Sequence, residues 1–548
     1  MTSEDPQQLA AHSTKPNVLV VAPPGCGKTE LLALRAQALI PRLRPNQRIL
    51  ALTFTNRAKD NLTERLRQLL GDQRFRRYVT VRNFHGHAAE IVLAHGPTIG
   101  LARNDLLMPT SRTLRKAIQA FSADRNANSA AAELLAELKR SPISDDEVVA
   151  ALEAAGDALA KAVEVQRSAA NQLHYEDLLR HAQRILRIDV IANLYHQHYG
   201  AVLVDEFQDL SLQQLDIAMR TCTTSRTFAG DPLQGIYSWA GAAPREVEAS
   251  LRACCGEPIQ LTVSYRSSPA VLTLLNTVSG WMGAQPLQAH DAQAWPGGGV
   301  SAALELPTLQ IEADRIARMS TQITAVDPSA SVGIITRSGW RHTEIDKVFA
   351  AMPAIQYRRW DLAIEDPRIF ERLRTAVAAM PSNISMAEAQ GKVIDAIDPG
   401  DVDTIELVND AFEQLSAASA GSVREALGQF RVRTSNAAVG PGVHLLNAHT
   451  GKGQQFDWVF IPGLEEKHLP DRRSTTGDAL AEETRVLLVM ISRARHGVIV
   501  TRSTTATGRY GTYATQPSRW WGDLATSATM DLSELSNHLD KFYSAEGS

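Results

Sequence analysis

Cysteine is scarce in this chain of 548 residues: there are four, and no two of them form a Cys-x-x-Cys pair. This absence argues against a disulfide framework and against a zinc ribbon, and it fits a reducing cytoplasm. Long apolar runs are also missing, since none reaches the roughly 18 residues that a membrane span needs. The N-terminal segment MTSEDPQQLAAH lacks the apolar core of a signal peptide. We therefore expect a cytoplasmic protein with no membrane partner.

A large excess of positive charge is absent too, because the net charge is −4. This value argues against a protein that coats nucleic acid by bulk charge. The hydrophobic fraction of 44% and the charged fraction of 21% are ordinary globular values, which excludes collagen-like and wholly disordered classes. The charge is uneven, however, since residues 31–80 hold 11 Lys or Arg against 3 Asp or Glu. A solvated face and a local basic groove are both open at this point.

The order of apolar runs predicts two α/β regions, each interrupted by a helix-rich stretch. Short apolar runs alternate with helical patterns in the first 100 residues, which predicts a parallel sheet. The expected strands are 18–22, 49–54, 79–84, 201–206, 227–230, 259–265, 331–336, 443–449, 459–464 and 497–501. The expected helices include 56–70 and helical spacing in 130–139 and 145–166, and the region between about 360 and 436 is also helix-rich.

A phosphate-binding loop is indicated by the segment APPGCGKT, which lies between an expected strand and an expected helix. Its amides and the helix N-terminus would hold the phosphates of a nucleotide. Lys28 would reach the β- and γ-phosphates, and Thr29 would bind Mg²⁺. The candidate nucleotide-binding residues of this loop are Ala22, Pro23, Pro24, Gly25, Cys26, Gly27, Lys28 and Thr29. The alternative is a Gly-rich turn without a ligand.

An Asp-Glu pair at the end of an apolar run predicts the acidic half of such a site. The run Val202-Leu-Val is followed by Asp205, which can bind Mg²⁺, and by Glu206, which can polarise the attacking water. A solvated strand end is the alternative, but the phosphate-binding loop in the same chain favours a nucleotide site.

The motif DEFQD from Asp205 resembles a signature of the UvrD/PcrA/Rep-like superfamily 1A DNA helicases, and further motifs follow in the same order. The matching segments are TFTNRAKDNL from Thr53, NFHG from Asn83, AGDPLQGIYSWAGA from Ala229, VSYRSS from Val263, HLLNAHTGKGQQFDWVFIPGLEE from His444, EETRVLLVMISRAR from Glu482 and PSRW from Pro517. The resemblance spans nearly the whole chain. It implies an α/β fold with two RecA-like parallel-sheet motor domains, each with a helical insertion.

The resemblance also divides the chain. The implied parts are a first motor domain of 1–96 and 172–256, a helical insertion of 97–171, a second motor domain of 257–360 and 436–530, a reduced helical insertion of 361–435, and a polar, frayed tail of 531–548.

An ATP site with bound Mg²⁺ is implied as well. Gln7 would hydrogen-bond the adenine, and Tyr265 would stack on it. Gln455 stands where the family has a Glu that contacts the ribose. The implied catalytic set is Lys28, Asp205, Glu206, the γ-phosphate sensor Gln234, and the arginine fingers Arg266 and Arg493, with Thr29 and Asp205 on the metal.

The resemblance places single-stranded DNA on the loops that follow the strands. The candidate DNA-binding residues are Thr53, Phe54, Thr55, Asn56, Phe84, His85, Tyr237, Trp239, His449 and Thr450. Phe54 and Phe84 could instead be core residues at strand ends. With this match, the basic window 31–80 favours a groove that tracks phosphates beside Thr53.

Some positions depart from the family pattern. Glu30 and Ala240 stand where Arg is common, Gln455 replaces a Glu, and Thr484 and Ser492 replace Arg and Thr, while Arg485 and Arg493 are kept. The second insertion is much shorter than in the large family members, which favours translocation or partner-dependent action. The short segment after the last motifs resembles no nuclease, which argues against a fused helicase–nuclease.

We therefore expect an ATP-dependent helicase or translocase that moves 3′ to 5′ on single-stranded or tailed duplex DNA, in repair, recombination or defence. The alternative is a DNA-stimulated ATPase sensor subunit with a nuclease or repair protein as partner. In its size and reduced insertions, the chain resembles the helicase-like partner of Gabija-type antiphage systems. A non-enzymatic DNA-binding module is disfavoured by the intact Lys28 and Glu206, and a kinase is disfavoured by the later motifs.

Overall fold

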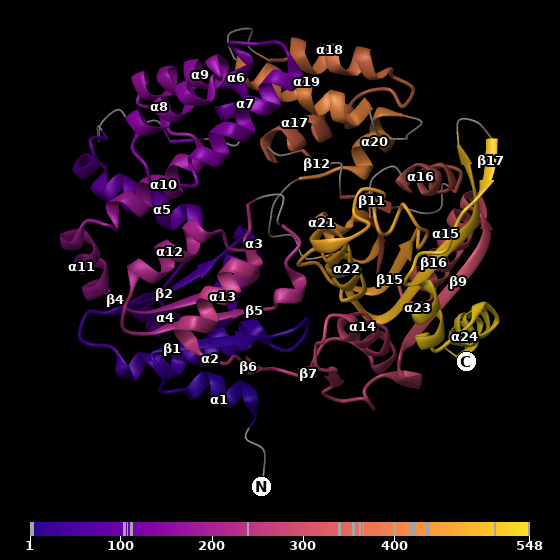
Figure 1. Cartoon of the computed structure of the whole chain (residues 1–548). Coiled ribbons are helices and arrows are strands. Elements are labelled where there is room, and N and C mark those ends of the chain that lie inside the picture. Colours follow the sequence, from indigo (N-terminus) through magenta and orange to yellow (C-terminus); the bar gives the residue numbers. More distant parts are fainter. Residues whose placement is uncertain are drawn as a thin grey trace. The chain divides into compact units, whose positions relative to one another are not determined.

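The computed structural model describes residues 5–101, 106, 108–109, 113–237, 241–337, 341–352, 357–360, 363–364, 367–397, 402–416, 422–432, 439–508 and 511–545. The chain divides into two compact units (Figure 1). The first comprises Met1–Pro23 and Gly27–Leu261, and the second comprises Pro24–Cys26 and Thr262–Ser548.

The first unit is built on a parallel sheet that, in the described residues, has six strands in the order β3-β2-β4-β5-β1-β6. The strands are β1 (Asn17–Val21), β2 (Arg48–Thr53), β3 (Val79–Asn83), β4 (Tyr199–Asp205), β5 (Arg226–Gly230) and β6 (Ile259–Gln260). Every residue of β4 is buried, as expected of an apolar strand in the middle of a parallel sheet.

Helices cover both faces of this sheet (Figure 1). They are α1 (Pro6–His12), α2 (Lys28–Leu39), α3 (Asn56–Leu70), α4 (Asp72–Tyr78), α5 (Phe84–His95), α10 (Tyr175–Ile185), α11 (Asp189–His198), α12 (Leu212–Thr221) and α13 (Pro244–Cys255). One core lies between the sheet and α5, α10, α12 and α13, and α2 and α3 contact the strands as well. Short 3₁₀ turns η3 (Phe207–Asp209) and η4 (Pro232–Gln234) follow β4 and β5.

Helix α3 shows why local sequence determines this layout. The hydroxyl of Thr55 caps the helix by accepting a hydrogen bond from the Ala58 amide at 3.1 Å. Leu62, Leu66 and Leu70 repeat every fourth residue and are buried. Gly71, with φ +74°, ends the helix. The predicted helix 56–70 is confirmed residue for residue.

The first insertion consists of α6 (Thr113–Gln119), α7 (Arg125–Leu138), α8 (Asp145–Ala155) and α9 (Ala158–Ala169), around a small apolar core of its own. The predicted helical region 145–166 is therefore two helices. Gly156 ends α8 in the left-handed region at φ +73°, and the Asp157 carboxylate then caps α9 by accepting from the Ala160 amide at 2.9 Å.

The second unit contains a larger sheet, whose described strands follow the order β11-β14-β10-β15-β16-β17, with β9 also paired to β16. The pairings are parallel except that of β16 with β17. The strands are β9 (Val300–Thr308), β10 (Ser331–Thr336), β11 (Tyr357–Arg359), β14 (Gly442–Asn447), β15 (Phe456–Pro462), β16 (Ala494–Gly508) and β17 (Gly511–Ala514). Short pairs are formed by β7 (Val263–Ser264) with β8 (Gln288–Ala289) and by β12 (Ala363–Ile364) with β13 (Arg431–Val432).

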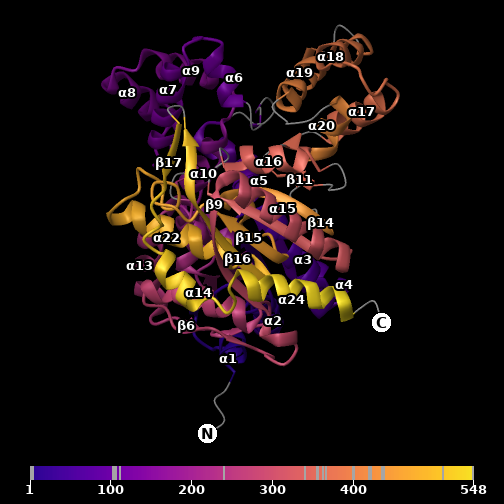
Figure 2. The same ribbon diagram turned by 90° about the vertical axis from the view of Figure 1, so that its right-hand side faces the viewer.

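The helices of this sheet are α14 (Pro269–Trp281), α15 (Leu309–Val326), α16 (His342–Ala350), α21 (Ala448–Gly451), α22 (Gly477–Ile491), α23 (Trp521–Ser527) and α24 (Leu532–Ala545). One core joins α15, α16 and α24 to the strands, and α14, α22 and α23 contact the strands too (Figure 2). The second insertion, α17 (Pro367–Ala378), α18 (Met386–Asp395), α19 (Val402–Ser416) and α20 (Val423–Gln429), forms a separate lobe with its own core (Figure 2).

The predicted fold class is confirmed: the chain is α/β with two parallel-sheet, RecA-like domains. Two details were wrong. The expected frayed tail is a helix, α24, because Leu535 and Leu539 pack into the core of the second unit. The expected strand 259–265 is two short strands, β6 in the first unit and β7 in the second. Strand β9 was not predicted.

Candidate nucleotide and DNA sites

The phosphate-binding segment Ala22–Thr29 joins the end of β1 to the start of α2. Gly25 and Gly27 have φ +80° and +75°, a conformation that favours glycine. A Cβ atom on Gly27 would lie 2.6 Å from Gln7 Nε2, so only glycine fits there without a shift. The N-terminus of α2 has no side-chain cap, which leaves its first amides for a phosphate. This cradle fits the phosphates of a nucleotide.

Gln7, the predicted adenine-binding residue, lies against this loop. Its amide Nε2 donates to the Gly27 carbonyl at 3.0 Å, and its backbone amide is capped by Asp5 Oδ1 at 3.0 Å. The end of α1 and the segment after it are held by Arg35 of α2, a fully buried cation that donates to the carbonyls of Ala11 and Ser13 and to Thr227 Oγ1. Arg35 was not among the predicted residues, because a single arginine in a helical pattern carries no site signal.

The catalytic candidates Lys28, Asp205 and Glu206 meet in the first unit. Lys28 Nζ lies 3.5 Å from Asp205 Oδ1 and forms a second ion pair with Glu206. Burial acts to lower the pKa of Lys28, but the two carboxylates outweigh it and leave that pKa raised. Burial raises the pKa of Asp205 to about 6, against the opposing effect of Lys28. The Thr29 hydroxyl and the Asp205 carboxylate are oxygen donors of the kind that Mg²⁺ prefers.

Glu206 is held in the left-handed region, at φ 56° and ψ 51°. For a residue other than glycine this backbone costs on the order of 1–3 kcal/mol, and such residues cluster at functional sites. The conformation turns the chain directly after β4 and brings Glu206 to Lys28.

A chain of hydrogen bonds connects Glu206 to the predicted γ-phosphate sensor Gln234. Gln208 Nε2 donates to Glu206 Oε2 at 2.6 Å, and Gln208 Oε1 accepts from the Asp231 amide at 2.9 Å. Gln234 Nε2 then donates to Asp231 Oδ2 at 2.9 Å. Gln208 and Asp231 were not predicted as site residues, although both belong to the quoted motifs DEFQD and AGDPLQ. Their buried amide and carboxylate groups fix Gln234 relative to the acidic pair.

The other nucleotide candidates lie in the second unit. The Tyr265 amide donates to the Gly25 carbonyl at 2.9 Å, and its half-exposed ring stacks on His290 with centroids 4.4 Å apart. Arg493 is buried, and its guanidinium donates to the carbonyls of Val489 and Gln454 and to Ser492 Oγ. Arg266 is partly buried and Gln455 is exposed. The roles of Tyr265, Arg266, Gln455 and Arg493 stay predictions.

Two of the predicted DNA contacts come together at the end of β2. The rings of Phe54 and Tyr237 are stacked with centroids 5.7 Å apart and an interplanar angle of 23°. Thr55 caps α3, and Asn56 Oδ1 accepts from Asn83 Nδ2 at 2.7 Å. Loops that follow β2, β3 and β5 therefore meet here, at the carboxyl ends of neighbouring strands.

The side chains of two other DNA candidates, Phe84 and Thr53, are buried, and their contact with DNA stays a prediction. Phe84 is 1% exposed and belongs to the core of the first unit, because α5 begins at this residue and turns its ring inward. Thr53 is fully buried, and its hydroxyl donates to the Thr55 carbonyl at 3.2 Å. His85 is stacked on Tyr175 at 4.1 Å, and burial lowers its pKa to about 4, so it is neutral near pH 7. Trp239 lies outside the described residues.

His449 and Thr450 lie in the short helix α21, directly after β14. The Thr450 hydroxyl forms a capping box with Asn447: it accepts from the Asn447 amide at 3.1 Å, and Asn447 Oδ1 accepts from the Thr450 amide at 2.9 Å. Thr450 thus orders the loop, and its contact with DNA stays a prediction, as does that of His449.

Comparison with known proteins decides the family. The profile described as UvrD/REP helicase N-terminal domain matches residues 3–252, and that of the UvrD-like helicase C-terminal domain matches residues 405–505. The chain is 22% identical to DNA helicase II of Rickettsia typhi over 99% of this chain and 98% of that protein. It is 26% identical to the ATP-dependent DNA helicase UvrD2 of Mycobacterium bovis, over 96% of this chain and 82% of that protein.

The chain belongs to the UvrD-like superfamily 1 helicases. A further relative, ATP-dependent DNA helicase UvrD1 of Mycobacterium bovis, is 25% identical over 91% of this chain and 82% of its own length. Membership of this helicase family supports ATP-dependent DNA helicase activity, with DNA as the substrate. The names of these relatives carry neither a nuclease partner nor an antiviral role.

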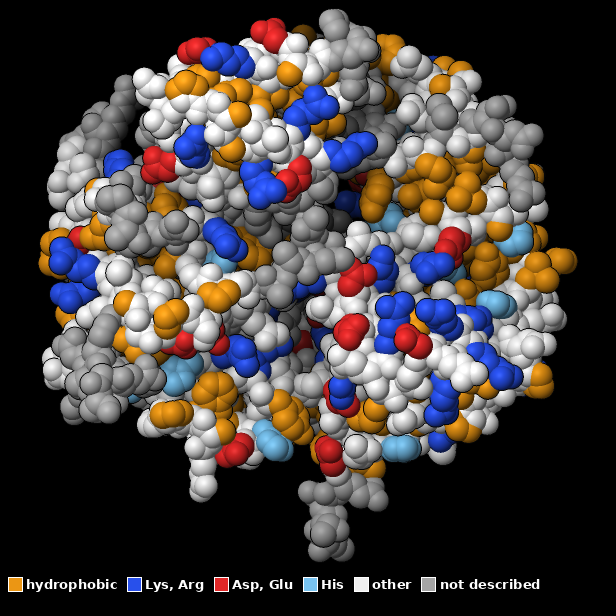
Figure 3. Space-filling model, turned by 180° about the vertical axis from the view of Figure 1, so that it is seen from behind, with side chains coloured by type: hydrophobic (Ala, Val, Ile, Leu, Met, Phe, Trp, Pro, Cys, Tyr) orange, Lys and Arg blue, Asp and Glu red, His pale blue; other side chains and the backbone are white. Residues whose placement is uncertain are grey.

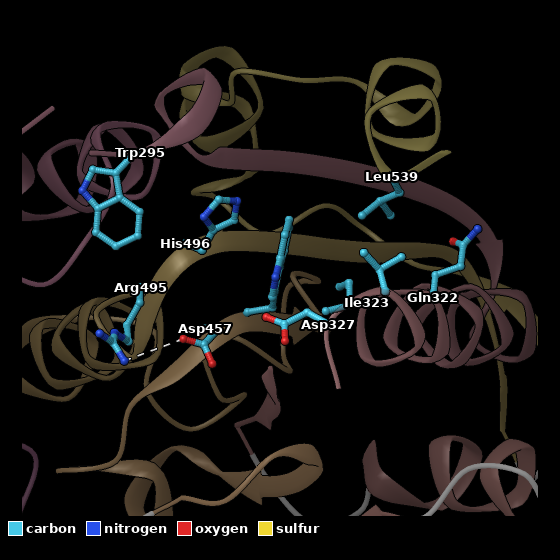
Figure 4. Close-up of a pocket in the computed structure, with 10 residues that line it drawn as sticks. Trp295, Gln322, Ile323, Asp327, Asp457, Arg495, His496 and Leu539 are labelled. Carbon is cyan, nitrogen blue, oxygen red and sulfur yellow. Dashed lines mark ion pairs between the residues drawn. The ribbon is translucent and has the colours of Figure 1, made fainter. Parts of the chain in front are cut away.

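One pocket of this UvrD-like chain contains none of the predicted residues (Figure 4). It has a volume of about 210 Å³ and lies in the second unit, between α15, α24 and the starts of β15 and β16. Trp458 and His496 form its aromatic wall, with ring centroids 4.9 Å apart, and Arg495 pairs with Asp457 at 3.7 Å on its rim. Among the described helices, none is both long and apolar enough to cross a lipid bilayer.

Proposed function

We propose that this chain is a single-stranded DNA motor that hydrolyses ATP with Mg²⁺ and moves 3′ to 5′. The observation that carries the proposal is the cluster of Lys28, Asp205 and Glu206, which the hydrogen bonds of Gln208 connect to Gln234. Such a connection links the groups that would act on ATP to a loop whose Tyr237 touches Phe54.

Each residue has a distinct task in this proposal. Lys28 and the loop amides bind the phosphates, and Thr29 with Asp205 holds Mg²⁺, which supplies charge neutralisation for phosphoryl transfer. Glu206 accepts a proton from the attacking water. Because Lys28 forms ion pairs with both carboxylates here, phosphate binding to Lys28 would release Glu206 for this role. Gln7 and Tyr265 select adenine, and Arg266 and Arg493 supply positive charge during hydrolysis.

The test measures ATP hydrolysis with and without single-stranded DNA. We expect DNA to stimulate hydrolysis by the wild-type protein. The variant Lys28→Ala should lose ATP hydrolysis, with and without DNA. Glu206→Gln should slow hydrolysis by about 10²–10⁴-fold, the usual contribution of a general base, while nucleotide binding remains. Glu246→Gln, an exposed carboxylate on α13, is the matched control and should behave as wild type. A wild-type protein without DNA stimulation would contradict the proposal.

Polarity needs a second measurement, strand displacement on duplexes with either a 3′ or a 5′ single-stranded tail. We expect displacement from the 3′ tail alone. The short second insertion, whose helices span 367–429, favours a second candidate, a DNA-stimulated ATPase that does not unwind by itself and serves a nuclease-containing defence complex. Stimulated hydrolysis without displacement from either tail would support that candidate.

A further inference from the structure

Four exposed arginines form a basic surface on the first unit. This surface, the α4 arginine surface, consists of Arg67 near the end of α3 and of Arg74, Arg76 and Arg77 on α4. Asp72, which lies between Arg67 and Arg74 in the sequence, places its Oδ1 3.7 Å from Arg67 Nε. Among the described residues, Arg74 and Arg76 have no ion-pair partner. Figure 3 shows mainly Lys and Arg side chains gathered over this part of α3 and α4.

Within the first unit, the surface lies away from the predicted ATP-binding and single-strand-binding residues. Strand β2 ends at Thr53, next to Phe54 and Thr55, and α3 then runs back toward the start of the strand. Fifteen helical residues span about 22 Å, so α4 lies near the amino ends of the strands, opposite the carboxyl ends where Phe54 and Thr55 lie. The basic window 31–80 is therefore not one groove around Thr53, because most of its exposed arginines are at the far end of α3.

The helix that carries three of these arginines is held in place by its surroundings. Arg48, at the start of β2, donates to the carbonyls of Arg77 and Val79 at 2.8 and 2.7 Å and to Thr80 Oγ1 at 2.9 Å, which fixes the end of α4. Phe75 anchors the helix in the interior. The guanidinium of Arg67 lies 5.2 Å from the centre of the Phe75 ring. Because the helix is already fixed in this way, binding a ligand does not have to order its backbone.

The chemistry of the surface matches a phosphate backbone. Guanidinium groups bind phosphate oxygens with paired, charge-assisted hydrogen bonds. Unstacked bases need aromatic faces, and α4 offers none, since Phe75 is buried and the half-buried Tyr78 lies under the Arg77 guanidinium at 5.1 Å. We propose that the α4 arginine surface binds the backbone of duplex DNA, as a contact separate from the single-strand site. This rests on the proposed DNA motor function.

The test uses the full chain and a short, blunt-ended DNA duplex as the probe. The variant Arg74→Gln/Arg76→Gln/Arg77→Gln should bind the duplex about tenfold more weakly at low salt. Its log–log dependence of affinity on salt should flatten by about 0.9 for each phosphate that the variant no longer neutralises. Hydrolysis stimulated by single-stranded DNA should be unchanged. The single variant Arg76→Gln should also bind the duplex more weakly, with a smaller loss of affinity than the triple variant.

A matched control removes three exposed arginines from the second unit, Arg318→Gln/Arg374→Gln/Arg473→Gln, with the same change in net charge. It should keep wild-type duplex affinity. Unchanged duplex binding by the α4 variants would overturn the proposal and leave an acidic protein segment as the occupant. An equal loss of single-strand stimulation would also overturn it, because the surface would then belong to the common track. If wild-type protein shows no stimulation by single-stranded DNA, the motor function itself fails, whatever the duplex affinity.

Discussion

Arg35 shows how a buried cation can control a binding residue that it does not touch. Its guanidinium donates to the Ala11 carbonyl in the last turn of α1, the helix that carries Gln7, and to the Ser13 carbonyl just after it. Burial lowers the pKa of Arg35 to about 10, so it remains charged near pH 7, and its three acceptors replace part of the lost hydration. The position of Gln7 therefore depends on an interaction at the other end of a short helix.

We predict that Arg35→Met weakens the preference for ATP over GTP. The net worth of one hydrogen bond, about 0.5–1.5 kcal/mol, predicts a rise of about twofold to twelvefold in KM for ATP, with kcat nearly unchanged. Steady-state hydrolysis of both nucleotides measures this. Arg42→Met is the control, because Arg42 also donates to the Ser13 carbonyl, at 3.0 Å, but is exposed. A lower melting temperature with unchanged nucleotide preference would show that Arg35 only stabilises the fold.

Phe84 and Tyr237 should respond to truncation in opposite ways. Phe84→Ala removes a buried ring, which typically costs about 3–5 kcal/mol of the free energy of unfolding. Tyr237→Ala should leave stability nearly intact and weaken stimulation by single-stranded DNA, since base stacking is worth about 1–3 kcal/mol per base. Urea unfolding and DNA-stimulated hydrolysis distinguish the two. Loss of DNA stimulation at full stability in Phe84→Ala would contradict its place in the core.

The contrast between these residues marks how far the sequence predicts the site. Lys28, Asp205 and Glu206 could be named because the chemistry of a nucleotide needs those groups in short, characteristic segments. Phe84 could not be assigned, because an aromatic residue after a strand fits a base or a core equally well. Its burial depends on α5 and α10, which lie far apart in the sequence and meet only in the fold.

Secondary-structure elements were predicted correctly where several local sequence signals agreed. They were missed where tertiary packing determines the structure. Helix α3 has a cap, a regular apolar stripe and a terminal glycine, so its bounds were predictable. Strand β9 was not predicted, because the apolar pattern of 300–308 contains small residues and a proline and gains its identity from pairing with β16. The C-terminal helix was missed because its stripe of Leu535 and Leu539 is sparse among polar residues.

Helix α24 should contribute to the stability of the second unit. Leu535 is fully buried against the core that contains α15 and β9, so Leu535→Ala should lower the free energy of unfolding by about 2–5 kcal/mol. Urea unfolding measures the change. Asn537→Ala, an exposed position in the same helix, is the control and should have little effect. Equal effects of the two substitutions would show that the helix is not part of the core.

Across the whole chain, charged side chains form local clusters that the net charge does not reveal. A net charge of −4 coexists with the α4 arginine surface and with the two carboxylates that form ion pairs with Lys28. Contacts between such a surface and phosphates should weaken steeply as salt rises, while ion pairs inside the protein are screened much less. Salt should therefore release DNA before it unfolds the protein.

Several buried histidines give the whole molecule a common response to acid. Burial, together with a nearby cation in each case, lowers the pKa of His87, His174, His181 and His468 to about 3. In the unfolded chain these groups titrate near 6.5. Between pH 6.5 and 3 the unfolded chain therefore binds protons that the folded chain excludes, and stability falls as the pH falls through this window.

We predict that the free energy of unfolding decreases steadily from pH 7 to pH 4.5, by up to about 1.4 kcal/mol per pH unit for each such histidine. Asp205 opposes this by one proton, because its raised pKa of about 6 makes the folded state bind a proton that the unfolded state releases. Urea unfolding at constant ionic strength measures the slope. His87→Phe should make the slope shallower by one proton, and an exposed control, Asn537→Ala, should leave it unchanged. A flat profile would mean that these histidines are protonated in the folded protein, with their charge compensated by groups around them.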